Sequence, residues 1–362
     1  MKKTILTGSI LLAIILIMMV QSCKKETKAT IEVNNLYNLE YGIFPPPQIP
    51  NDNLLTEQGV KLGRMLFYEK KLSSNNQMSC ANCHNQKTAF SDTNKFSIGV
   101  LGLPGGKQAM GIFNMAWNSN GFFWDGRSIL LREQSLLPIQ DSLEMHETLT
   151  SAIVKLQASE MYRTQFKKVF GTEIVTSELM SKALEQFMNS IVSYQSKYDN
   201  YLAGKATLTA AEEKGRFLFF TEYNPAFPNS SGADCQHCHG GSNFENDKYM
   251  NNGLDNDANM TDIGRQKVTN KLADKAKFKV TSLRNVELTH PYMHDGRFKT
   301  LDEVVEHYNL VTNSSTLDAS FQQQLPNGGL KLSANDKAAL VAFLKTLTDY
   351  KLTTDTRYST PF

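Results

Sequence analysis

The sequence CANCH at residues 80–84 returns as CQHCH at residues 235–239, so one C-x-x-C-H pattern occurs twice in a chain with only five cysteines. Two cysteines three positions apart present both thiols along one edge of a helical turn, where each can add to a vinyl group of haem. The adjacent histidine then gives a ring nitrogen to the iron. The pattern therefore predicts two covalently bound haem c groups. The residues expected to attach them and to bind iron are Cys80, Cys83, His84, Cys235, Cys238 and His239.

Zinc is the main alternative occupant, because four cysteines with nearby histidines can form a structural zinc site. Zinc motifs seldom place a histidine directly after the second cysteine in both halves, and haem attachment suits an exported chain better. His237, which lies inside the second motif, is interpreted as a spacer residue.

The first 22 residues have the pattern of a secretory signal peptide. Two lysines precede an apolar run from Ile5 to Val20, which is too short and wrongly flanked for an ordinary membrane span. The stretch VQSC at 20–23 resembles a bacterial lipobox, which predicts that Cys23 becomes the first mature residue and carries lipid. Several acyl chains on one residue anchor a protein stably. We therefore expect residues 23–50 to be a lipidated tether on an exported, periplasm-facing lipoprotein that contacts the membrane through this anchor only.

The cysteine count and the composition agree with this interpretation. With Cys23 lipidated and four cysteines used for haem, none is left for a disulfide. The chain has 362 residues and is 41% hydrophobic, which is enough for two cores. Its formal net charge of +2 gives no basis for a nucleic-acid partner.

A similar segment precedes each haem motif. LTEQGVKLGRMLF (55–67) and LTAAEEKGRFLFF (208–220) share Leu-Thr, then Gly-Arg, then Leu-Phe. Both predict short amphipathic helices, and the second begins with a capping box of Thr209 and Glu212. This repeat indicates a duplicated domain. We expect an all-α fold of two cytochrome c-like haem domains with long loops, an N-terminal one over 51–200 and a C-terminal one over 201–362.

Apolar periodicity predicts further helices. From Thr176, apolar side chains recur at steps of three and four residues as far as Tyr198, which predicts one long helix. Ser333 is the expected N-cap of a helix near the C-terminus. The acidic loop at 253–266 lacks the glycine and glutamate of a calcium-binding EF-hand, so we expect a solvated loop.

The stretch FFWDGRSILLREQSLLPIQDSLEMH at 122–146 holds residues suited to peroxide chemistry. Glu144 could move a proton between the two peroxide oxygens, Gln134 could hold the peroxide, and Trp124 could carry electrons. Taken singly, each has an ordinary structural role open to it: a surface charge, a polar helix residue and a core side chain.

From about residue 51 to 350, the chain resembles the bacterial di-haem cytochrome c peroxidase and MauG family. The matching segments are CANCH with TAFSD, SIG at 97–99, FFWDGR at 122–127, REQSLLPI with SLEM to 145, CQHCH, and FKVTSLRNVELTHPYMHDGRFKTLDEVVEHYN at 278–309. The resemblance implies that Trp124 lies between the haems. It also implies that Gln134 and Glu144, with Pro138 at the matching spacing, line the distal pocket of a peroxide-reducing N-terminal haem, while the C-terminal haem receives electrons.

The chain departs from many family members at the residue after SIG, where a distal histidine is replaced by Val100. No histidine occurs between His84 and His146. The resemblance to the MauG branch therefore implies that the N-terminal haem is five-coordinate without prior reduction.

The sixth ligand of the C-terminal haem is the second departure. The position fourteen residues after His294 carries methionine in many members and tyrosine in the MauG branch, and here it is Tyr308. Tyrosinate favours ferric iron, whereas methionine raises the reduction potential. Tyr308 is the expected ligand, and Met293 is the alternative.

The resemblance further implies a calcium ion, bound by the carbonyls of Thr289 and Pro291 and by Gln108 in place of the family's asparagine. The expected enzyme is a cytochrome c peroxidase that takes hydrogen peroxide as substrate and a small cytochrome c or copper protein as electron donor. A homodimer is left open. The alternative functions are a MauG-like oxidase that modifies a protein side chain and a non-enzymatic electron carrier.

Overall fold

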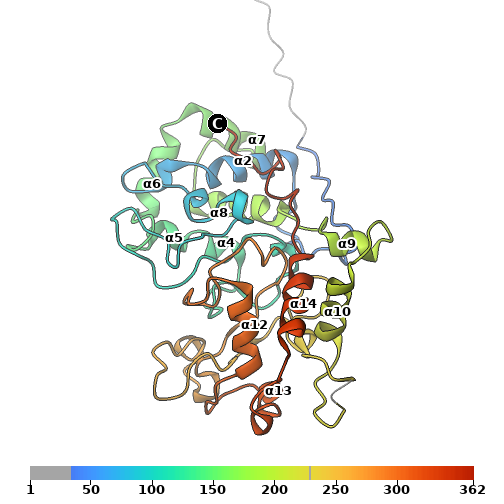
Figure 1. Cartoon of the computed structure of the whole chain (residues 1–362). Coiled ribbons are helices and arrows are strands. Elements are labelled where there is room, and N and C mark those ends of the chain that lie inside the picture. The colour runs from blue at the N-terminus through green and yellow to red at the C-terminus, as the bar shows by residue number, and fades with distance from the viewer. Residues whose placement is uncertain (1–33, 228–229) are drawn as a thin grey trace, which may run out of the picture. The chain divides into compact units, whose positions relative to one another are not determined.

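Helices make up most of the regular structure in the computed structural model, which describes residues 34–227 and 230–362 (Figure 1). The first half contains α2 (Glu57–Phe67), α3 (Cys80–Cys83), α4 (Leu131–Gln134), α5 (Leu137–Gln140), α6 (Leu149–Gln157), α7 (Glu160–Phe170) and α8 (Ser177–Ser190). The second half contains α9 (Lys197–Leu202), α10 (Ala210–Phe220), α11 (Gln266–Thr269), α12 (Leu301–Leu310), α13 (Ala319–Gln322) and α14 (Ala334–Lys345). The 3-10 helices are η1 (Lys70–Leu72), η2 (Gln86–Thr88), η3 (Met115–Trp117), η5 (Cys235–His237), η6 (Leu272–Asp274) and η7 (Leu325–Asn327).

The strict all-α prediction needs one correction. Strands β1 (Tyr249–Met250) and β2 (Phe278–Lys279) form a small antiparallel pair in which Tyr249 lies opposite Lys279. Two extended loop segments meet here and satisfy their backbone amides and carbonyls by pairing. The mainly helical character is confirmed.

The predicted signal peptide at residues 1–22 and the lipidation site at Cys23 lie outside the described residues, so both stay predictions. Within the part of the chain that is described, no helix is long and apolar enough to cross a membrane. Residues 34–362 form one compact unit. The division into haem domains at 51–200 and 201–362 stays a prediction.

The two segments that share Gly-Arg each supply one helix of a closely packed pair. Helix α2 packs on α8, and α10 packs on α14, which Figure 1 shows side by side. A Cβ atom on Gly63 would lie 1.9 Å from the Ala183 carbonyl oxygen, and one on Gly215 would lie 1.9 Å from the Ala339 carbonyl oxygen. Only glycine allows either approach. The repeated glycine therefore has the same packing role in both halves.

These helix pairs lie in two hydrophobic clusters. In the first, Phe67 and Phe187 have ring centroids 5.3 Å apart, and in the second, Phe219 and Phe343 have centroids 5.2 Å apart. Edge-on and tilted ring contacts of this kind add to the free energy of apolar burial. Tyr358 also belongs to the first cluster, so the C-terminal segment returns to the N-terminal half.

The helix starts predicted from capping residues are confirmed. The Thr209 hydroxyl accepts a hydrogen bond from the Glu212 amide at 3.3 Å, and the Ser333 hydroxyl accepts one from the Asp336 amide at 3.2 Å. Helix α2 is capped in the same way by Thr56. Local sequence is sufficient to set these three boundaries, because each cap lies three residues from its partner.

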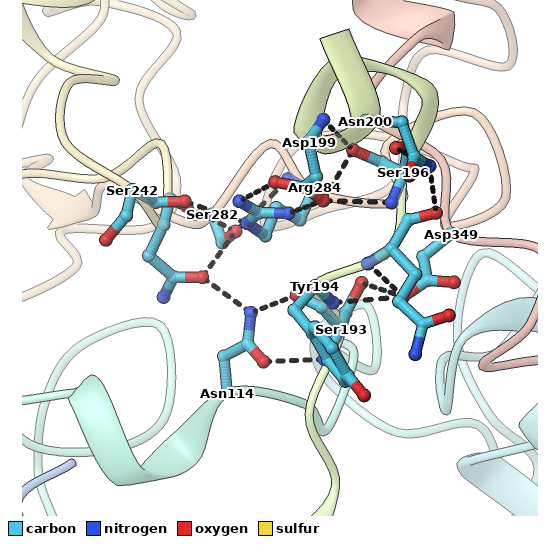
Figure 2. Close-up of polar contacts among 12 residues, drawn as sticks. Asn114, Ser193, Tyr194, Ser196, Asp199, Asn200, Ser242, Ser282, Arg284 and Asp349 are labelled. Atoms are coloured by element: carbon cyan, nitrogen blue, oxygen red, sulfur yellow. Dashed lines mark hydrogen bonds and ion pairs between the residues drawn. The ribbon is translucent and has the colours of Figure 1, made fainter. Parts of the chain in front are cut away.

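The long helix predicted over residues 176–198 is wrong in its second half. Helix α8 ends at Ser190, and α9 begins only at residue 197. Between them, the Ser193 amide donates to the Asn114 side chain at 2.8 Å, and the next two amides each donate to the Asp349 carboxylate at 3.0 Å (Figure 2). These acceptors from distant parts of the chain replace the helical carbonyls.

Residues 36–50, which were expected to belong to a tether, contact the folded part. The Trp117 indole nitrogen donates to the Pro45 carbonyl at 2.8 Å, and the Gln48 amide donates to the Ala116 carbonyl at 2.8 Å. Phe44 is buried, and the Arg284 guanidinium lies 4.6 Å from its ring centroid. The segment therefore makes contacts that a free tether would not make.

The acidic loop at 253–266 is more firmly held than a solvated loop. The Asp255 carboxylate pairs with both terminal nitrogens of Arg297 at 2.8 and 2.9 Å. Asp257 accepts from Ser315 at 2.8 Å and from Lys275 at 3.2 Å. Residues 257–259 and 261 are exposed, as expected of a solvated loop, and the loop's carboxylates in addition pair with partners that lie later in the chain.

Candidate functional site

The first haem motif forms a short helix followed by an oriented histidine. Cys80 and Cys83 are the first and last residues of α3, and His84 follows directly. The His84 Nδ1 atom lies 2.8 Å from the Phe90 carbonyl oxygen. A carbonyl oxygen only accepts hydrogen bonds, so Nδ1 carries the hydrogen and Nε2 is left with its lone pair free for a metal. Burial lowers the pKa of His84, which keeps the ring neutral.

The second motif repeats this arrangement with a different turn. Cys235 begins the 3-10 helix η5, and the His239 Nδ1 atom lies 3.1 Å from the Phe244 carbonyl oxygen. Burial lowers the pKa of His239 to about 4. Both histidines therefore present a neutral Nε2, the form that binds haem iron.

Sequence reasoning missed the two phenylalanines whose carbonyls orient these rings. Phe90 has φ +57° and Phe244 has φ +54°, both in the left-handed region. This backbone conformation is uncommon for a residue with a side chain and turns the chain back toward the preceding histidine. The available signal in the sequence was a phenylalanine six residues after His84 and five residues after His239.

The surroundings of the motifs fit covalently bound haem. Cys235, Cys238 and His239 line one large cavity. The rest of its lining is mostly apolar and includes Phe219, Val286, Leu301, Val305, Leu340 and Leu344. An apolar wall around two thiols and a neutral imidazole suits a flat, apolar ring attached through thioethers. The first motif likewise supplies two thiols and a neutral imidazole.

Glu144 lies beside the first motif. Burial raises the pKa of the Cys80 thiol to about 12 and also raises that of Cys83, and the Glu144 carboxylate adds to both shifts. The Val100 amide donates to the Glu144 backbone carbonyl at 2.8 Å. Val100 is thus hydrogen bonded directly to the main chain of Glu144.

The environment of the Glu144 side chain favours a protonated carboxyl. Burial, with a smaller contribution from the Asp141 charge, raises its pKa to about 7, although Arg127 opposes the shift. A carboxyl with a pKa near 7 is populated in both protonation states at neutral pH. Gln134 is half-buried at the end of α4. Convergence of Gln134 and Glu144 on one peroxide stays a prediction.

Trp124 connects the two halves of the site. It lines the cavity of the second motif, and its indole nitrogen donates to the Gln108 carbonyl at 2.8 Å. The Gln108 side chain in turn donates to Ser91 at 3.0 Å, next to the Phe90 carbonyl that orients His84. The position of Trp124 therefore agrees with a place between the two motifs, and its role in electron transfer stays a prediction.

The structure brings the two candidate sixth ligands together. Tyr308 on α12 and Met293 both line the cavity of His239. The Asn252 side-chain nitrogen lies 3.2 Å from the Tyr308 oxygen and 3.5 Å from the Met293 sulfur. Burial raises the pKa of Tyr308 to about 12. The choice between the two ligands stays open on geometry alone.

The three residues proposed for calcium also line this cavity, namely Gln108, Thr289 and Pro291. The Gln108 amide nitrogen donates to Ser91 and to the Asp92 carbonyl, which leaves its oxygen as the group that could face a cation. Calcium binding stays a prediction.

Comparison with known proteins now adds the family. A family model described as di-haem cytochrome c peroxidase matches residues 57–207. The cytochrome c551 peroxidase of Nitrosomonas europaea is 34% identical over 81% of this chain and 82% of its own length. The chain belongs to the di-haem cytochrome c peroxidase family.

Members on the MauG side of the family are comparably similar. The methylamine utilization protein MauG of Methylophilus methylotrophus is 30% identical over 82% of this chain and 84% of its own length. The crystal structure of a MauG-like protein associated with microbial copper homeostasis is 31% identical, covers 90% of this chain and 99% of its own, and gives a TM-score of 0.81. Membership in the di-haem family implies two haem c groups, and the cysteine pairs at 80/83 and 235/238 are available to attach them.

Proposed function

We propose that the chain is a di-haem peroxidase that reduces hydrogen peroxide to water with electrons from a small external cytochrome c or copper protein. The observation that carries this proposal is the carboxyl of Glu144, which is half-buried beside the first haem motif and has a pKa raised to about 7. A proton-transfer group poised near neutral pH is what cleavage of a peroxide O–O bond requires. Family membership supports the reaction class.

Protein side chains supply proton transfer and orientation in this scheme. When bound, haem supplies the redox-active iron for the balanced reaction H2O2 + 2 H+ + 2 e− → 2 H2O. Glu144 would take a proton from one peroxide oxygen and return it to the other, which would leave as water. The Gln134 amide would hold the peroxide. Trp124, which lines the cavity of the second motif and donates to the Gln108 carbonyl, would carry electrons toward it.

The proposed iron ligands give the two haem positions different tasks. His84 would hold the haem at which peroxide reacts, and Val100, at the position expected for a distal ligand, has no group that can coordinate iron. His239 would hold a second haem with Tyr308 as its sixth ligand, and this haem receives electrons from the donor. The proposed peroxide site therefore needs no ligand to leave before peroxide binds.

The test is peroxide turnover by the full-length holoprotein together with its resting spectrum. We expect a high-spin ferric EPR signal that peroxide abolishes, and consumption of one peroxide for every two electrons taken from a reduced donor. Two low-spin signals that peroxide leaves unchanged, with no donor oxidation, would show an electron carrier and refute the proposal.

A MauG-like oxidase that modifies a protein side chain is the second candidate function. Tyr308 in the cavity of His239 and Val100 beside Glu144 favour it, as does the 31% identity to a MauG-like protein. The two functions differ in how they respond to the donor. If reduced donor removes the oxidising equivalents within one turnover, the chain is a peroxidase. If they persist until a protein substrate is added, the oxidase is supported.

We further propose that the protein is exported, faces the periplasm and is anchored by lipid at Cys23. We expect radiolabelled palmitate to mark the wild-type chain and Cys23→Ala to abolish the label. Cys23 lies far in sequence from both haem motifs, so haem content should be unchanged. Label retained by Cys23→Ala would refute this anchor.

A further inference from the structure

One side-chain amide faces both candidate ligands of the second haem site. The Asn252 Nδ2 atom lies 3.2 Å from the Tyr308 oxygen and 3.5 Å from the Met293 sulfur. All three residues line the cavity that also contains Cys238 and His239. The two groups that compete for one coordination position therefore share one hydrogen-bond donor.

Asn252 is held in place from both sides. Its backbone carbonyl lies 3.1 Å from the His307 Nε2 atom, so its main chain is tied to α12 directly beside Tyr308. The preceding residue, Asn251, is buried and donates to Ser314 and Thr316, both at 2.9 Å.

The Gly253 backbone completes this support. Its carbonyl accepts from the Thr312 amide at 3.2 Å. A Cβ atom on Gly253 would lie 2.5 Å from the Thr312 carbonyl oxygen, so the backbone approaches too closely for a side chain. The backbone on both sides of Asn252 is thus held by these contacts, which place its side-chain amide toward the two candidate ligands.

An amide donor does not favour the two ligands equally. A tyrosine oxygen bound to ferric iron carries negative charge and forms a strong, charge-assisted hydrogen bond. A thioether sulfur is only a weak acceptor. The same donor therefore stabilises Tyr308 on the iron more than it stabilises Met293.

We propose that Asn252 is a positioning residue that selects Tyr308 over Met293 as the sixth ligand of the haem at His239. The inference rests on the placement of Tyr308 under the proposed function, but not on peroxide turnover. It identifies a side chain outside both haem motifs as the determinant of ligand identity.

The test uses the full-length ferric holoprotein without peroxide or donor, so the result does not depend on catalysis. Near-infrared magnetic circular dichroism and EPR distinguish tyrosinate from thioether ligation. In Asn252→Leu, which keeps the side-chain size and removes the donor, we expect the ratio of methionine to tyrosine ligation to rise about tenfold, the scale of one hydrogen bond to a charged oxygen. Asn252→Gln, which keeps the amide, should restore tyrosine ligation.

Two further variants control the experiment. Asn259→Leu removes an exposed asparagine that lies outside the cavity lining, and its spectrum should match the wild type. Adding Met293→Leu to Asn252→Leu should remove the new thioether signal and so assign it to Met293. Unchanged tyrosine ligation in Asn252→Leu, with full haem content, would overturn the role of Asn252. Thioether ligation already present in the wild type would overturn the placement of Tyr308, and with it this inference.

Discussion

At the scale of single residues, burial gives Glu144 its proposed chemistry. Removal from water penalises the charged carboxylate, and the nearby Asp141 charge adds to the penalty. The result is a group that holds a proton at pH 6 and gives it up at pH 8. An exposed glutamate would be ionised throughout this range and could not return a proton.

We expect Glu144→Gln to lower peroxide turnover by about 10² or more, because a glutamine cannot accept and return a proton. In the wild type, kcat/KM should rise with pH through about 7 as Glu144 ionises. Steady-state assays from pH 5.5 to 8.5 would check both expectations. Glu133→Gln, which removes an exposed charge from α4, is the matched control and should keep wild-type turnover and its pH profile. An unchanged rate in Glu144→Gln would remove Glu144 from the mechanism.

Glu144→Gln should lower turnover but raise the stability of the folded protein at high pH. The folded pKa of Glu144 is raised, so the folded state binds its proton more tightly than the unfolded state does, and this contribution to stability falls as pH rises from about 4.5 to 7. At pH 8, Glu144→Gln should therefore raise the free energy of unfolding by about 1–2 kcal/mol. Urea denaturation at pH 5 and pH 8 would measure this, and an equal effect at both values would contradict the assigned pKa.

At the scale of elements, the two helix pairs depend on glycines at equivalent positions. Gly63 lets α2 approach the α8 backbone, and Gly215 lets α10 approach the α14 backbone. Each pair lies in one hydrophobic cluster, so a wider helix separation would open that cluster. Close packing of this kind tolerates little added volume.

We expect Gly63→Ala and Gly215→Ala each to lower the free energy of unfolding by about 1–3 kcal/mol, because the new methyl group must push a neighbouring backbone aside. Gly106→Ala is the control, since no atom lies within 4 Å of the added Cβ and its φ is not positive. Thermal and urea denaturation would compare the three variants. Stability of Gly63→Ala equal to that of Gly106→Ala would show that α2 and α8 are less closely packed than described.

At the scale of the whole molecule, a buried ion pair joins distant segments. Arg284 and Asp199 are 1% and 4% exposed and form two hydrogen bonds of 2.8 Å (Figure 2). Arg284 also donates to the Ser242 carbonyl at 2.8 Å and packs against Phe44. This one guanidinium therefore contacts α9, the loop after the second motif and the N-terminal segment.

Breaking this pair should be costly. Asp199→Asn leaves the Arg284 charge buried without a counterion, and we expect a loss of about 3–5 kcal/mol in the free energy of unfolding. Burial alone would raise the pKa of Asp199, but Arg284 and the hydrogen bonds from Ser196 together hold it below its usual range. Stability from this pair is thus present above the unfolded pKa and lost as pH falls. Asp302→Asn, on the exposed face of α12, is the control. Equal stability of the two variants in urea at pH 7 would contradict the prediction.

Local patterns determined much of this protein. Both haem motifs, the capped starts of α10 and α14, and the repeated Gly-Arg segment depend on residues within one or two helical turns, so the sequence alone reveals them. Resemblance to a known family added the expected roles of Glu144, Gln134, Trp124 and Tyr308.

Tertiary structure decided what depends on distant partners. Helix α8 ends at Ser190 because the amides that follow find Asn114 and Asp349, neither of which is near in sequence. Glu144 acquires its raised pKa mainly from desolvation beside the first motif. Asn252, from a third segment of the chain, lies within hydrogen-bond distance of both Tyr308 and Met293. Hydrogen bonding and desolvation depend on which groups meet in space, and sequence spacing does not record that.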